Sequence, residues 1–253
     1  MTTQVEQIFF DVGDTLRIVV EDDAHRANAY KRVTELLGVD ADPFEFAEVL
    51  NERYEGYRKW ATKAWVELPE AELWHQFLTP DIPREVTDKN AVELTYLFRQ
   101  FKGYRVTADN AMEVVQELTK RGYHLGIISN VITSQELPDW LKDDGLEPYF
   151  SPVVLSSTTG IRKPDPRIYE IALKEANLTP DKCCYIGDNV ERDMGGSHTV
   201  GFGMRILIDH KGVIKREFTE LTKPDAIITG CMDLLDIFPG DGRINTESKW
   251  MYK

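Results

Sequence analysis

The residues that decide the fold are Ile8-Phe9-Phe10-Asp11-Val12-Gly13-Asp14-Thr15, a short apolar run that ends abruptly in a carboxylate. An apolar run this short, without polar alternation, is typical of a strand buried on both faces, as in a parallel sheet covered by helices. Runs of the same kind recur downstream, at residues 125–128, 153–155, 183–186, 205–208 and 226–228. We therefore expect a mostly parallel sheet in which residues 8–10 form the first strand.

Helical patterns separate these apolar runs. Asp109 can cap a helix that Gly122 ends, and Pro166 begins another. The residues expected to face inward are Met112, Val115 and Leu118 in the first helix, and Ile168, Ile171 and Ala172 in the second. Strand and helix alternate in this way over residues 106–238. The pattern predicts an α/β class fold, a doubly wound, Rossmann-like core.

Residues 17–104 have a different pattern. This segment lacks runs typical of strands, and its apolar residues recur at helical spacing. A connection of this length needs a core of its own, so we expect an inserted α-helical domain. The predicted division is residues 1–16 plus 105–238 for the α/β core, 17–104 for the helical insertion and 239–253 for a polar C-terminal tail.

Composition excludes several classes of protein. Of the 253 residues, 42% are hydrophobic and 29% charged, which is typical of a folded globular chain. The net charge of −13 argues against wrapping a nucleic acid, which needs a basic face. No stretch approaches the ~18 consecutive apolar residues of a membrane span, and residues 1–15 lack the features of a secretory signal. We expect a cytoplasmic protein with no membrane partner and with reduced cysteines.

Reactive side chains follow several of the predicted strands. Asp11 follows the first, Ser129 and Asn130 follow the second, and Lys163 and Asp188 come after later ones. Ligands of open α/β sheets bind beyond the carboxyl ends of the strands, so we expect these side chains to meet at one edge. Carboxylates there suit Mg²⁺, a lysine and a hydroxyl suit phosphoryl oxygens, and an aspartate can attack phosphorus. The predicted chemistry is phosphoryl transfer to an aspartate.

The order of these residues resembles the motifs of the haloacid dehalogenase-like hydrolase superfamily. The four motifs are Asp11 to Thr15, Ser129, Lys163-Pro164, and Gly187-Asp188 with Asp193. The helical insertion stands where that family places its C1-type cap. The resemblance implies the fold and an Mg²⁺-dependent hydrolase that acts on a small phosphorylated metabolite.

The resemblance also implies roles for individual residues. Asp11 would be the nucleophile, forming an aspartyl-phosphate, and a metal ligand. Ser129, Asn130 and Lys163 would bind the phosphoryl group, with Lys163 also serving catalysis. Asp188 would hold Mg²⁺ directly, and Asp193 would act through a metal-bound water or by orienting Lys163.

Position 13 departs from the family pattern. The family's phosphatases carry a second aspartate two residues after the nucleophile, as general acid, whereas this chain has Gly13. The Gly13 carbonyl can still bind Mg²⁺ but donates no proton. Asp14 is adjacent and is a candidate substitute, although a one-residue step in an extended chain reverses the side-chain direction.

Other readings therefore stay open. The acidic pair Asp188 and Asp193 favours a metal-dependent phosphoryl site over carbon–halogen cleavage. A phosphonate-cleaving enzyme would use a cap lysine as a Schiff base, and no lysine in residues 17–104 stands out. A catalytically weakened binding or regulatory protein is the alternative that Gly13 supports. The sequence names neither the substrate nor the oligomeric state.

Overall fold

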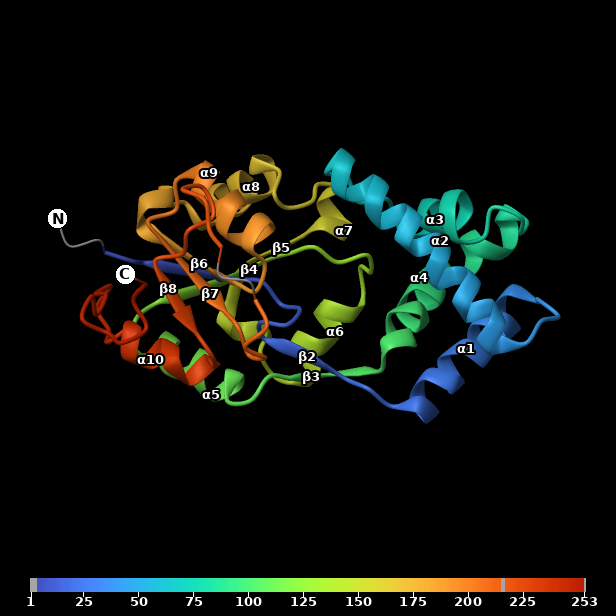
Figure 1. Ribbon diagram of the computed structural model, residues 1–253, viewed down its shortest axis with the longest axis horizontal. Coiled ribbons are helices and arrows are strands. Elements are labelled where there is room, and N and C mark those ends of the chain that lie inside the picture. Colours follow the sequence, from blue (N-terminus) through green and yellow to red (C-terminus); the bar gives the residue numbers. More distant parts are fainter. Residues whose placement is uncertain (1–3, 215–216, 253) are drawn as a thin grey trace.

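The computed structural model describes residues 4–214 and 217–252 and is built around a six-stranded sheet (Figure 1). The strand order is β5-β4-β1-β6-β7-β8, and all neighbours are parallel. The strands are β1 (Gln7–Phe10), β4 (His124–Ser129), β5 (Phe150–Leu155), β6 (Cys183–Gly187), β7 (Met204–Ile208) and β8 (Ala226–Ile228). The predicted α/β class and parallel sheet are confirmed.

Strand β1 lies in the middle of the sheet, between β4 and β6. Successive side chains of a strand point to opposite faces. Ile8 and Phe10 therefore pack in the core on one face, and Phe9 in the core on the other. Because the chain winds away from β1 in both directions, Asp11 emerges at the crevice where ligands of such sheets bind.

Helices cover both faces of the sheet (Figure 1). One face carries α5 (Ala111–Lys120) and α10 (Leu234–Ile237), and the other carries α8 (Pro166–Ala176) and α9 (Gly196–Val200). The predicted start of α8 at Pro166 is confirmed, with Asp165 as its N-cap.

The prediction for α5 is wrong in two details. Asn110, not Asp109, is the N-cap, and it lies in the left-handed region without a side-chain cap bond. Met112 is exposed, whereas Val114 joins Val115 and Leu118 in the core. The helix begins one residue later than predicted because a backbone turn, not an aspartate side chain, precedes its first turn.

A separate group of helices lies to one side of the sheet (Figure 1). It contains α1 (Asp23–Leu37), α2 (Pro43–Ala64), α3 (Glu70–Leu73) and α4 (Arg84–Arg99). The sequence marks their ends, since Gly38 ends α1 in the left-handed conformation and Asp42 caps α2 before Pro43. Their buried side chains form a hydrophobic cluster of their own. We call residues 23–102 the helical unit.

The helical unit is joined to the rest of the chain by two short strands that the sequence analysis missed. β2 (Arg17–Val20) pairs antiparallel with β3 (Tyr104–Thr107), so residues 17–104 are not free of strands, contrary to the prediction. The missed signal was the β-branched run Ile18-Val19-Val20, which favours a strand although it is only half-buried.

A second connection, which we call the strap, joins residues 65–67 to residues 160–162. Val66 forms an antiparallel bridge with Ile161, Glu67 N–H donates to the Gly160 carbonyl, and Arg162 N–H donates to the Trp65 carbonyl. The Glu67 carboxylate is fully buried, pairs with Arg162 and accepts from the Ser156 hydroxyl at 2.7 Å. The strap thus ties the helical unit to the loop that precedes Lys163.

The C-terminal residues lie against the edge of the sheet. Met251 bridges to Ala226, and the Ile227 N–H donates to the Trp250 carbonyl at 3.0 Å. This contact covers the exposed edge of β8, which would otherwise offer unpaired backbone groups. The polar tail is docked rather than frayed.

Shorter elements complete the described chain. They are α6 (Glu136–Asp143), α7 (Ser156–Thr159), π-helical turns at Trp74–Leu78 and Val190–Gly195, and 3₁₀ turns at Gln100–Lys102, Glu147–Tyr149, Pro180–Lys182 and Cys231–Asp233. The three cysteines are buried and unpaired. Within residues 4–214 and 217–252, no helix has the length and apolar character needed to cross a membrane.

Candidate active site

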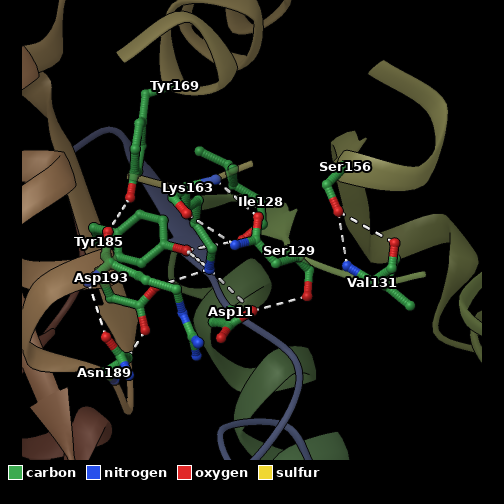
Figure 2. Close-up of polar contacts among 12 residues, drawn as sticks. Asp11, Ile128, Ser129, Val131, Ser156, Lys163, Tyr169, Tyr185, Asn189 and Asp193 are labelled. Carbon is green, nitrogen blue, oxygen red and sulfur yellow. Dashed lines mark hydrogen bonds and ion pairs between the residues drawn. The ribbon is translucent and has the colours of Figure 1, made fainter. Parts of the chain in front are cut away.

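The residues predicted at the sheet edge meet there, and Figure 2 shows Asp11, Ser129, Lys163 and Asp193 among them. Asp11 follows β1, Ser129 ends β4, and Asp188 follows β6. Lys163 reaches in from the loop before α8, and Asp193 from the turn after β6. The parallel register brings them together, since it aligns the carboxyl ends of the central strands.

Asp11 is held through one of its two carboxylate oxygens. The Ser129 hydroxyl donates to Asp11 Oδ1 at 2.8 Å, and Lys163 Nζ lies 3.1 Å from the same atom. Among the described residues, no hydrogen bond is directed at Oδ2, and Asp11 lines a cavity of about 150 Å³. One oxygen is thus fixed, and the other is available to a ligand in the cavity.

Lys163 is fully buried, and its ammonium group has three partners. It donates to Asp193 Oδ1 (2.7 Å) and to the Tyr185 hydroxyl (2.7 Å), and it forms an ion pair with Asp11 Oδ1. Tyr185 in turn donates to the Ile128 carbonyl at 2.8 Å (Figure 2). Sequence analysis missed this role of Tyr185, whose only signal was a polar atom within a buried strand, where a hydroxyl needs a partner.

Asp193 is positioned to orient Lys163. Its Oδ1 accepts from Lys163, and its Oδ2 accepts from the Asn189 N–H at 2.9 Å. Both oxygens are therefore engaged by the protein. Asp188 differs, because its buried Oδ1 has no partner among the described residues.

Three carboxylates at this edge are arranged as a metal site would require. Asp11, Asp188 and Asp193 offer ligand oxygens that all lie within 4.8 Å of one another. Hard oxygen donors of this kind suit Mg²⁺, and the unpartnered Asp188 oxygen is a buried acceptor that such an ion would satisfy. The residues present fit the cation.

The pKa values of these carboxylates are shifted in directions that also fit a metal site. Burial, together with the charges of Asp193 and Asp11, raises the pKa of Asp188 to about 8. Burial also raises the pKa of Asp193. For Asp11, the same burial is outweighed by Lys163, Arg192 and the Ser129 hydroxyl, which hold its pKa below the usual value. The neighbouring cations thus favour the ionised form of Asp11, whereas the buried Oδ1 of Asp188 has no partner among the described residues.

Gly13 and Asp14 lie at the mouth of this cavity. A Cβ atom built on Gly13 would meet no other atom within 4 Å, so the missing side chain leaves open space. Asp14 has a φ of 51°, is half exposed and pairs with Lys211 at 3.2 Å. Its carboxylate is thus engaged by the loop after β7, with no contact to Asp11.

Asn130 braces Lys163 rather than pointing freely into the cavity. Its Nδ2 donates to the Lys163 carbonyl at 3.0 Å, and its Oδ1 accepts from the Lys163 N–H at 2.8 Å. Both polar atoms of the Asn130 side chain are therefore engaged by the Lys163 backbone.

Arginines that the sequence analysis did not single out surround the cavity. Arg17, Arg99, Arg105 and Arg192 line both the smaller cavity and an adjoining one of about 280 Å³ that extends along the helical unit. Aspartates near Arg192 raise its pKa, although burial opposes this. No motif marks these arginines, because they come from segments that only the fold brings together.

Comparison with known proteins gives consistent likenesses. Residues 5–201 match the family model described as haloacid dehalogenase-like hydrolase. The haloacid dehalogenase-like hydrolase domain-containing protein 3 of Bos taurus is 37% identical over 93 residues, 37% of this chain and 36% of that protein. The matched chain thus spans little more than a third of that relative.

Two further proteins match over a longer stretch. The glyceraldehyde 3-phosphate phosphatase of Pyrococcus furiosus is 27% identical over 202 residues, 78% of each chain. The crystal structure of a 2-haloacid dehalogenase from Pseudomonas syringae pv. Tomato DC3000 has a TM-score of 0.67 at 19% identity and covers 92% of this chain and 97% of its own. At that identity the structural likeness shows the fold.

Proposed function

This chain belongs to the haloacid dehalogenase-like hydrolase family, and we propose that it is an Mg²⁺-dependent phosphohydrolase of small phosphorylated metabolites. The observation that carries the proposal is the ionised Asp11, fixed through one oxygen by Ser129 and Lys163 beside an unpartnered Asp188 carboxylate. Phosphatases among the similar proteins support it.

Asp11 acts as the nucleophile in this proposal. Its free Oδ2 attacks the phosphorus, a new O–P bond forms, and the bond from phosphorus to the substrate oxygen breaks with its electron pair leaving on that oxygen. The product is an aspartyl-phosphate, which water then hydrolyses to inorganic phosphate and Asp11. Lys163 and Ser129 hold Oδ1, so the attacking oxygen is oriented before the substrate arrives.

Asp188 and Asp11 would hold the cation, and the Gly13 carbonyl would be a further donor. Asp193 would act indirectly, by orienting Lys163 or through a metal-bound water. When bound, Mg²⁺ supplies positive charge that offsets the repulsion between the carboxylates and the phosphoryl oxygens. The chain's own part is to present the acidic cluster in a buried crevice.

The helical unit serves as the cap in this proposal. We assign residues 1–16 and 105–238 to the core, 17–104 to a C1-type cap and 239–253 to the tail. The helical unit and the core line the larger cavity together, so closure would exclude water around the phosphoryl group. A cytoplasmic location and small-molecule partners belong to the same proposal.

Gly13 sets the expected substrate preference. A leaving group of high pKa needs a proton as the P–O bond breaks, and neither Gly13 nor the Lys211-paired Asp14 is placed to give one. Aryl and acyl phosphates leave without that help, so they should be the better substrates. General acid catalysis contributes about 10²–10⁴-fold, which sets the scale of the difference.

The phosphonate-cleaving alternative has less support. Lys102 of the helical unit lines the larger cavity, but its side chain is exposed. A Schiff-base lysine is activated by desolvation or by a neighbouring cation, and an exposed ammonium group stays hydrated.

The test is phosphate release from 4-nitrophenyl phosphate, acetyl phosphate and glycerol 3-phosphate, with Mg²⁺ and with a chelator. The wild type should turn over the first two fastest, and only with Mg²⁺. Asp11→Asn should reduce the rate by about 10³-fold or more. Asp23→Asn is the matched control, since Asp23 is 93% exposed at the start of α1.

The alternative of a binding or regulatory protein makes the opposite prediction. Tight binding of phosphorylated ligands with no release of phosphate from any of them, or a rate that Asp11→Asn leaves unchanged, would refute the proposed hydrolysis.

A further inference from the structure

Three arginines that surround one carboxylate line both cavities, on the side formed by β2, β3 and the end of α4. We define this arginine cluster as Arg17, Arg99 and Arg105, with Glu136 at its centre. In the register of β2 and β3, Val19 is opposite Arg105, so Arg17 and Arg105 fall on the same face of the strand pair. Arg99 arrives from the last turn of α4.

Glu136 cannot balance the charge of the cluster. Its Oε2 lies 2.8 Å from Arg99 Nε, and its Oε1 lies 3.2 Å from Arg17 Nη1 and 3.5 Å from Arg105 Nη1. Burial alone would raise the pKa of Glu136, but the arginines hold it below its usual value, so the carboxylate is ionised. Asp144 is a further acidic group close enough to act on Arg17. Two negative charges thus face three positive charges.

The excess charge is largely removed from water. The side chains of Arg17 and Arg105 are each only 10% exposed, and that of Arg99 is 27% exposed. Burial and the charge of Arg99 lower the pKa of Arg105 to about 10. Burying charge without a partner is costly, and within the described residues the buried Nε of Arg17 has no acceptor at all.

The two acidic side chains that line the larger cavity are already paired. Asp14 pairs with Lys211, and Glu55 with Arg58 at 2.9 Å. Arg105 Nη1 also donates to the Arg99 carbonyl at 2.7 Å. All three arginines line both cavities, and the planar, forked geometry of a guanidinium group matches a carboxylate or a phosphate.

The cluster and the nucleophile share one cavity. Arg17, Arg99 and Arg105 line the smaller cavity together with Asp11 and Ser129. A molecule whose phosphoryl group lies at Asp11 would extend its other end toward the cluster.

We propose that the substrate carries a second anionic group, a carboxylate or a second phosphate, and that Arg17, Arg99 and Arg105 bind it. The proposal rests on the proposed function only for placing the phosphoryl group at Asp11. It narrows the substrate class to small phosphorylated acids or bisphosphates and excludes neutral sugar phosphates as the preferred substrates.

Binding of inert phosphonates tests the subsite without turnover. The ligands are alkylphosphonates that end in a methyl group, a carboxylate or a second phosphonate, each with two and with three methylene groups. Dissociation constants are measured by calorimetry in one Mg²⁺ buffer of fixed ionic strength. We expect a charged end to lower Kd by at least about tenfold relative to the methyl end at one or both lengths.

Variants assign that preference to the cluster. In Arg99→Gln and Arg105→Gln, the Kd of the methyl-ended ligand divided by that of the charged ligand of the same length should fall toward one. Arg99→Lys should retain part of the preference because it keeps the charge. Arg32→Gln is the control, since Arg32 is half exposed on α1 and pairs with Glu93 at 2.9 Å. A melting curve for each variant shows that it is folded.

The outcomes separate the two claims. Equal Kd values for charged and methyl ends at both lengths, or a preference that survives both glutamine variants, would overturn the subsite. Whether the carboxylate or the phosphonate end binds more tightly identifies the second group. Phosphate release without a preference for charged ends would refute the subsite alone, whereas such a preference without any phosphate release would refute the proposed hydrolysis alone.

Discussion

The two ends of the cavity are electrostatic opposites. At the sheet edge, the carboxylates of Asp11, Asp188 and Asp193 surround the buried Lys163, with Arg192 at their side. At the other end, three guanidinium groups surround the buried Glu136. Each end has an excess of one sign that the protein leaves uncompensated. The sheet edge therefore suits a cation, and the arginine cluster suits an anion.

The two ends also differ in how they are built. The sheet edge is assembled from consecutive strand ends of a parallel sheet, in a fixed register. The arginine cluster joins the strand pair β2–β3, the end of α4 and the start of α6. Its geometry therefore depends on how the helical unit sits on the core.

Removing Lys163 from the sheet edge should cause the largest loss in the free energy of unfolding. Lys163→Met leaves three buried or half-buried carboxylates without their shared cation, and breaking such a buried pair costs about 3–5 kcal/mol. Urea unfolding of the metal-free protein measures this loss. The control is Lys182→Met, because Lys182 pairs with Glu6 on the surface and should contribute less than about 1 kcal/mol. Equal losses in the two variants would show that the sheet edge is not short of positive charge.

The complementary change at the other end is Glu136→Gln. It leaves the three arginines without a carboxylate and should lower the free energy of unfolding by about 1–3 kcal/mol. Glu93→Gln, which removes a half-exposed partner of Arg32, should change it by less than about 1 kcal/mol.

The pH dependence of that loss has a definite sign. Because the folded protein holds the pKa of Glu136 below its ordinary value of 4.5, the stabilisation is fully present above pH 4.5. It disappears as the pH falls through the lowered pKa. Urea unfolding at pH 7 and at pH 4 therefore should show a larger difference between wild type and variant at pH 7. A difference that grows on acidification would contradict the proposed charge pairing.

The smallest expected effect is a gain in turnover, and it comes from a substitution at Gly13, between the carboxylates and the arginine cluster. Gly13→Asp places a carboxyl group in open space beside Asp11 and should raise kcat for glycerol 3-phosphate by about tenfold or more, through general acid catalysis. Turnover of 4-nitrophenyl phosphate should change much less. Gly13→Asn has the same shape but no acidic proton, so a gain in that variant would argue against proton donation.

The sheet edge could be predicted from the sequence because its information is local. The short apolar runs predicted strands, and Asp11, Ser129 and Asp188, which closely follow three of these runs, lie at the same edge. The contacts of Tyr185 with Lys163 depend on the burial of both residues, which spacing does not report.

The arginine cluster could not be predicted in this way. Arg17 and Glu136 are 119 residues apart in the chain, and an isolated arginine is typically a solvated surface residue. The strands that carry Arg17 and Arg105 were missed because each has only four residues, half-buried, without a long apolar run. Packing of the helical unit on the core, not local sequence, creates the cluster.

The strap between residues 65–67 and 160–162 has a mechanical consequence. Lys163 directly follows Arg162, whose N–H is bonded to Trp65 and whose guanidinium pairs with the buried Glu67. A rotation of the helical unit about β2–β3 must either break these contacts, exposing the Glu67 carboxylate, or pull the Lys163 backbone with it. The strap therefore couples the position of the helical unit to the backbone of the lysine that contacts the nucleophile.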